Sequence, residues 1–143
     1  MNGTAAETRS VVVEREIAHP LEKIWRALTQ PHLIEAWLMK NDFSPVVGHR
    51  FNLRGEWCGV LDCEVLVVEP ERRLSYTWDF THDDPAFNLE SVVTFTLVPT
   101  NGGTLLRMEQ SGFRPEQKQA FGGAAAGWRE FFAKLEQALA RID

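Results

Sequence analysis

The stretch that decides the fold is PEQKQAFGGAAAGWREFFAKLEQALARID, residues 115–143. Its large apolar side chains recur three or four positions apart, from Phe121 through Trp128 to Leu139, and charged residues fill the positions between them. This spacing predicts one long amphipathic helix. At about 1.5 Å per residue such a helix is nearly 40 Å long, so we expect it to lie across a whole sheet.

The apolar face of this predicted helix is uneven. Its first half, Gly122–Gly127, contains only glycine and alanine, whereas Trp128, Phe131, Phe132, Leu135 and Leu139 make the second half bulky. A helix face without large side chains leaves space against the sheet that it covers. We therefore predict a ligand cavity beside the small half.

The preceding chain alternates between helical and strand periodicity. A β-branched strand, two short helices separated by Pro31, and five consecutive strands with one apolar face each are expected before the long helix. The expected bounds are Ser10–Ala18 for the first strand, Pro20–Gln30 and His32–Leu38 for the helices, and His49–Trp57, Val60–Glu69, Leu74–Phe80, Leu89–Val98 and Thr104–Gly112 for the later strands.

These elements predict an α+β fold in the order β-αα-βββββ-α, with a curved six-stranded antiparallel sheet around the C-terminal helix. One orientation stays open. The strand over residues 60–69 can face inward through Val65 and Val67 or through Leu66 and Val68.

Length and composition favour one domain over residues 10–143, after a disordered lead over residues 1–9. The net charge of −5 and the lack of a basic cluster argue against a nucleic-acid partner. No apolar run is long enough for membrane insertion, and no secretory signal is recognisable, so we expect a cytoplasmic protein. Cys58 and Cys63 are then expected to stay as thiols.

The sequence resembles a known family. The matching residues are Pro20, Ile24-Trp25, Leu28-Thr29, Pro31 and Trp37, then Glu69-Pro70, Leu74, Tyr76 and Trp78, and finally Gly127-Trp128, Phe131, Leu135 and Leu139. They are similar to the START-like or SRPBCC superfamily with its helix-grip fold, and within it to homologues of the C-terminal domain of the activator of the heat-shock protein 90 ATPase. The resemblance implies a scaffold that binds lipids, polyketides, flavonoid-like aromatics or a chaperone partner.

The candidate cavity residues lie on faces predicted to point between sheet and helix. They are Trp37, Phe51, Trp57, Tyr76, Trp78, Phe95, Met108, Phe121, Ala124, Ala125 and Trp128. Plain core packing is the alternative for each single aromatic residue. Candidate inward polar groups are Arg54, Asp62, Glu64, Arg107 and Gln110, although each is more readily explained as solvent-exposed. Glu64 and Arg107 are a candidate cross-strand pair.

The four histidines occur singly, so we expect no metal site and no cofactor. No sharply defined acid or base stands out for catalysis. The leading hypothesis is a module that binds an apolar or aromatic small molecule without covalent chemistry. The alternatives are a chaperone-associated interaction domain and a polyketide cyclase-like or hydrolytic enzyme that uses the same cavity. A homodimer stays open, and so does the role of the loop 81–88 with Phe87, which is either a lid or a packed anchor.

Overall fold

The computed structural model describes residues 8–55 and 59–142. Along the chain the elements are β1 (Arg9–Ile17), α1 (Leu21–Thr29), α2 (Pro31–Trp37), β2 (Lys40–Asn41), β3 (Arg50–Gly55), β4 (Gly59–Glu69), β5 (Arg73–Phe80), β6 (Leu89–Thr100), β7 (Gly103–Phe113) and α3 (Lys118–Leu139). One turn of 3-10 helix, Pro85–Phe87, lies between β5 and β6.

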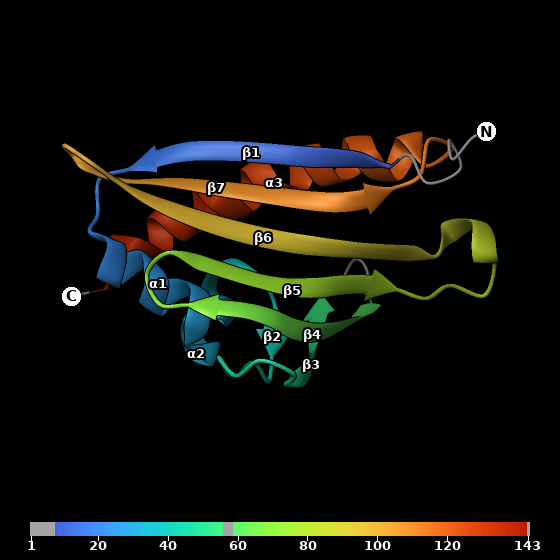
Figure 1. Cartoon of the computed structure of the whole chain (residues 1–143), viewed down its shortest axis with the longest axis horizontal. Coiled ribbons are helices and arrows are strands. Elements are labelled where there is room, and N and C mark those ends of the chain that lie inside the picture. The colour runs from blue at the N-terminus through green and yellow to red at the C-terminus, as the bar shows by residue number, and fades with distance from the viewer. Residues whose placement is uncertain (1–7, 56–58, 143) are drawn as a thin grey trace.

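The strands form one antiparallel sheet in the order β1-β7-β6-β5-β4-β3-β2, and α3 crosses one face of it (Figure 1). The first strand therefore pairs with the last, with Val13 opposite Met108. The α+β class and the C-terminal helix are as expected from the sequence, but the count of six strands was wrong. The additional strand, β2, contains only Lys40 and Asn41, which pair with Arg54 and Leu53 of β3, and two residues are too few to show alternation.

A β-bulge in β4 settles which side chains of this strand face inward. Leu61, Cys63 and Val65 are buried, whereas Leu66 is 39% exposed. The pairing with β5 shifts between Val65 and Val67, and beyond this shift Val68 packs against the core. The extra residue changes the face that the strand presents. Val65 and Val68 therefore both face inward. The alternative with Val65 inward holds before the bulge, and the alternative with Val68 inward holds after it.

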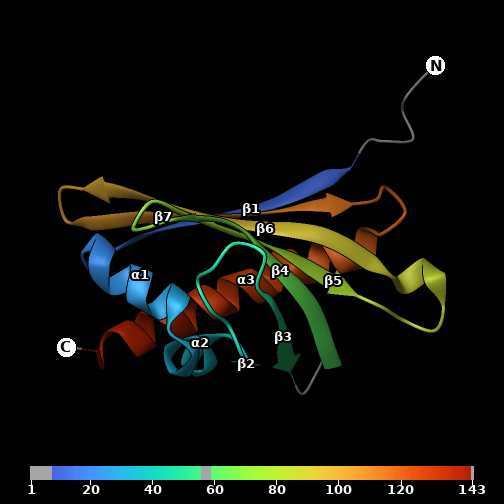
Figure 2. The same ribbon diagram turned by 60° about the horizontal axis from the view of Figure 1, so that its bottom comes forward.

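The core is filled most tightly where the bulky half of α3 meets α1 and α2. Phe132, Leu135 and Leu139 of α3 are fully buried, and both short helices pack against this end of α3 (Figure 2). Trp37 of α2 anchors the arrangement, because its indole N–H donates to the carbonyl oxygen of Ala27 at 2.8 Å. The other end of α3, where its small residues lie, is not covered by these helices (Figure 2).

Candidate ligand-binding cavity

A cavity of about 770 Å³ lies beside the N-terminal half of α3. Its wall is formed by Met39, Leu61, Trp78, Phe80, His82, Ala86, Phe87, Leu89, Gln110, Phe113, Glu116, Gln117, Gln119, Ala120, Gly123, Ala124, Gly127, Trp128 and Phe131. The volume is in the range of sites that hold a small organic ligand.

The small residues of α3 leave this space open. Gly123, Ala124 and Gly127 line the cavity, and a Cβ atom added at Gly123 or Gly127 would meet no heavy atom within 4 Å. Glycine in a helix interior costs about 1 kcal/mol relative to alanine. In α3 this cost is not explained by close packing, because nothing presses against either glycine.

Aromatic side chains from β5 and from α3 itself form much of the rest of the wall. The rings of Trp78 and Trp128 lie 5.1 Å apart between centroids, and Phe131 meets Trp128 edge-on at 5.4 Å. Phe80, on the same face of β5 as Trp78, continues this surface. Flat aromatic walls of this kind suit an apolar or aromatic guest.

A chain of buried polar groups links this wall to the sheet. The indole N–H of Trp128 donates to Oε1 of Gln110 at 2.8 Å, and Nε2 of Gln110 donates to Oγ of Ser91 at 3.0 Å. The Ser91 hydroxyl in turn donates to the carbonyl oxygen of Trp78 at 2.6 Å. These bonds fix the indole of Trp128 and the amide of Gln110 relative to the backbone of Trp78.

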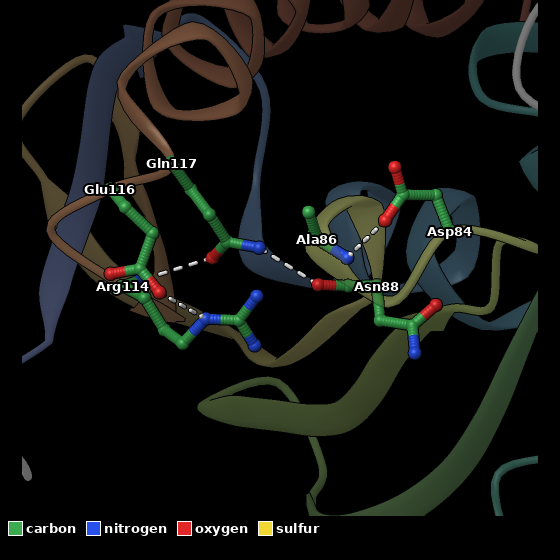
Figure 3. A network of polar contacts seen from close by, with 6 residues as sticks. All are labelled: Asp84, Ala86, Asn88, Arg114, Glu116 and Gln117. Atoms are coloured by element: carbon green, nitrogen blue, oxygen red, sulfur yellow. Dashed lines mark hydrogen bonds and ion pairs between the residues drawn. The ribbon is translucent and has the colours of Figure 1, made fainter.

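A second polar group joins the start of α3 to the loop between β5 and β6. Gln117, only 8% exposed, donates through Nε2 to the carbonyl oxygen of Asn88 at 2.8 Å and accepts through Oε1 from the backbone N–H of Arg114 at 2.9 Å (Figure 3). Asp84 accepts from the backbone N–H of Ala86 at 3.0 Å and begins the 3-10 turn. Gln117 therefore holds this loop at the rim of the cavity.

The loop presents Phe87 to the cavity. Phe87 lines the wall although it is 58% exposed, and its ring lies 5.1 Å from that of His82. It is therefore not a packed loop anchor. The loop forms part of the entrance, and its movement as a lid stays a prediction.

The residues expected from the sequence fall into three groups within the described chain, and one further residue lies outside it. Trp78, Ala124 and Trp128 line the cavity. Phe121 and Ala125 are half-buried beside it, with Phe121 edge-on to Phe113 at 5.6 Å. Trp57 lies outside the described residues. A further set is buried in the packed core away from the cavity wall: Trp37, Phe51, Tyr76, Phe95 and Met108.

Of the polar candidates, Gln110 alone is buried. Arg54 and Asp62 are exposed. Glu64 pairs with Arg50 at 3.4 Å on the neighbouring strand, and Arg107 pairs with Glu14 at 3.5 Å. The candidate pair of Glu64 with Arg107 was wrong, because β4 and β7 are not adjacent in the sheet.

Some lining residues carried a usable sequence signal that was missed. Phe80 follows Trp78 by two positions on a strand, and Phe131 follows Trp128 by three on a helix, so each shares a face with a residue already selected. By contrast, nothing local indicates that Met39, Leu61 and Leu89 meet the same cavity, because they come from distant segments.

Ionisable groups in the core are held neutral. Burial raises the pKa of the Tyr76 phenol and of the Cys63 thiol well above their ordinary values. Among the described residues of the cavity wall, His82 and Glu116 are ionisable. In the described ranges 8–55 and 59–142, no group of three or more His, Cys, Asp or Glu side chains is arranged to hold a metal ion. The described part of the chain also contains no helix with the length and apolarity to cross a bilayer.

The family model described as "Activator of Hsp90 ATPase homolog 1-like protein" matches residues 18–140. The chain belongs to this family. The match confirms the resemblance recognised in the sequence, and the helix-grip arrangement of sheet and C-terminal helix agrees with it. A comparison with curated proteins gave no match.

Solved structures of similar fold include proteins of several bacteria. MLL2253 from Mesorhizobium loti is 71% identical, with a TM-score of 0.91, over 94% of this chain and 99% of the other. CalU16 from Micromonospora echinospora is 25% identical, with a TM-score of 0.78, over 96% and 80%. DynU16, described as a protein of the dynemicin biosynthetic locus, is 24% identical, with a TM-score of 0.80, over 92% of this chain and 47% of the other. At 24% identity, the likeness to DynU16 shows the fold alone.

Proposed function

We propose that this family member binds an apolar or aromatic small molecule in the cavity between the sheet and the N-terminal half of α3. The carrying observation is the open space beside Gly123 and Gly127, which the aromatic side chains of Trp78 and Trp128 also border. Neither glycine is needed for close packing, and the wall is mostly apolar. Binding without covalent chemistry is the function that these features support best.

The indole N–H signals of the tryptophans test this proposal within one NMR spectrum. Trp128 lines the cavity, whereas the indole of Trp37 is hydrogen-bonded to Ala27 in the packed core. Titration with an apolar naphthalene should shift the Trp128 signal and leave the Trp37 signal unchanged. The titration is repeated with fatty acids, flavonoids and aromatic ketones. If the Trp128 and Trp37 signals move equally, or neither moves, with every one of these ligands, binding in this cavity is refuted.

The family description supports a second candidate function, an interaction with the Hsp90 chaperone. The cavity itself gives no reason for such an interaction. Pull-down with the chaperone and a measurement of its ATPase rate separate the two proposals, because the cavity variants described below should alter small-molecule binding without changing a chaperone contact on the outer surface.

A further inference from the structure

We propose that the cavity selects neutral aromatic ligands that carry a carbonyl oxygen, and that Gln110 is the residue that recognises this oxygen. The inference rests on the proposed function, because it names the ligand class of the same cavity. It goes further by predicting which polar atom the ligand must have and where.

The orientation of the Gln110 amide follows from its neighbours. The indole nitrogen of Trp128 can only donate, so the atom of Gln110 that it meets at 2.8 Å must be the amide oxygen. The amide nitrogen then faces Ser91, 3.0 Å away. Because the Ser91 hydroxyl gives its one hydrogen to the carbonyl oxygen of Trp78, it accepts from Gln110.

One hydrogen of the Gln110 amide is left over. The amide nitrogen carries two hydrogens, and among the described residues only Ser91 accepts from it. Gln110 is 1% exposed and lies on the cavity wall. A ligand acceptor that meets this second N–H in place of water gains about one net hydrogen bond, on the order of 1 kcal/mol or about tenfold in affinity.

The charges around the cavity favour a neutral acceptor group on the ligand over a charged one. The ionisable side chains on the described wall are Glu116 and His82, and none of the described lining residues is Arg or Lys. A carboxylate would enter without an Arg or Lys partner on the described wall, because Arg114, which lies beside the rim, is already paired with Glu116 at 3.0 Å. A ketone or quinone oxygen meets the Gln110 amide without this cost, while its ring lies against Trp78 and Trp128.

The experiment compares two ligands of nearly equal shape, 2-acetylnaphthalene and 2-isopropenylnaphthalene, in which a C=CH₂ group replaces C=O. Affinities are measured by calorimetry for the wild type, for Gln110→Met and for Gln137→Met. The last variant places the same substitution on an exposed position of α3 outside the cavity wall. The ratio of the two affinities is compared between proteins, which cancels the different hydration of the two ligands.

The preference for the ketone should fall about tenfold in Gln110→Met, the size of one net hydrogen bond, and stay unchanged in Gln137→Met. In the wild type, one of the two Gln110 side-chain N–H signals should move downfield with the ketone and not with the alkene. This NMR result decides the question even if Gln110→Met does not fold.

Two failures are distinguishable. If both ligands bind and the preference is the same in all three proteins, or the Gln110 signals do not respond to the ketone, recognition by Gln110 is refuted and the proposed function stands. If neither ligand binds to the wild type, the proposed function fails for aromatic guests, and the inference fails with it.

Discussion

Filling the cavity from the helix side is the sharpest test of how α3 is built. Gly122 and Gly123 are neighbours on α3, and a Cβ atom at either position meets nothing within 4 Å. Gly123 lies on the cavity wall and Gly122 does not. Replacing each in turn by leucine therefore changes the helix backbone in the same way but places the new side chain in different surroundings.

The expected effects on stability follow from two contributions. Replacing a helix glycine by leucine should raise the free energy of unfolding by roughly 0.5–1 kcal/mol at either position. At Gly123 the leucine side chain also covers apolar surface of the cavity, which adds about 1 kcal/mol because the site is only partly enclosed. Gly123→Leu should therefore raise the melting temperature by roughly 4–8 °C, and Gly122→Leu by about half as much.

Ligand binding should change in the opposite sense. Gly123→Leu occupies space that the guest needs, so we expect at least a tenfold weaker affinity for 2-acetylnaphthalene, whereas Gly122→Leu should bind like the wild type. Thermal unfolding followed by circular dichroism and calorimetric titration measure both effects. A Gly123→Leu protein that binds as tightly as the wild type, or that is less stable than it, would show that no usable space exists there.

Three further predictions concern other groups. Gln117→Met removes the acceptor of the Arg114 backbone N–H, so hydrogen exchange of that amide should accelerate and the free energy of unfolding should fall by about 1–2 kcal/mol. An unchanged exchange rate would contradict the role of Gln117 at the rim. Desolvation raises the pKa of Asp79, so the stability that this carboxyl contributes is present at low pH and is lost as the pH rises through its folded-state pKa. Asp79→Asn should therefore have a melting temperature at least as high as that of the wild type at pH 7, and any difference in its favour should vanish in acid. Melting curves from pH 3 to 8 test this. Because burial raises the pKa of Cys63, its thiol should resist iodoacetamide at pH 8 in the native protein and react in guanidinium chloride. Fragment-ion mass spectrometry measures this, because it assigns the label to Cys63 or to Cys58, and rapid native labelling of Cys63 would refute the prediction.

Most of the fold follows from periodicity, and its errors arise where periodicity stops. The alternation of Leu74, Tyr76 and Trp78 and the helical spacing of Trp128, Phe132 and Leu135 are long repeating patterns, and they predict their elements well. Strand β2 is too short to repeat, and the bulge at Leu66 changes the period within β4. Neither feature has a local sequence signature.

The position of the cavity along α3 was predictable for the same reason, but most of its wall was not. Gly123, Ala124 and Gly127 indicate where side chains are missing. Which aromatic residues face that space depends on how far α1 and α2 extend over the sheet, because α2 brings Trp37 into edge-on contact with Phe95 in the packed part of the core. That boundary is set by tertiary packing rather than by spacing along the chain.

The pairing of β1 with β7 has a consequence for how the protein forms during synthesis. Thr104 donates to the carbonyl oxygen of His19, a residue 85 positions earlier in the chain. Until the ribosome has made β7, the first strand has no neighbour to add to, and α3 follows only after that. We therefore expect the sheet to close late, at a rate limited by this distant pairing, with the nascent first strand relying on its charged residues Glu14 and Arg15 to stay free of other chains.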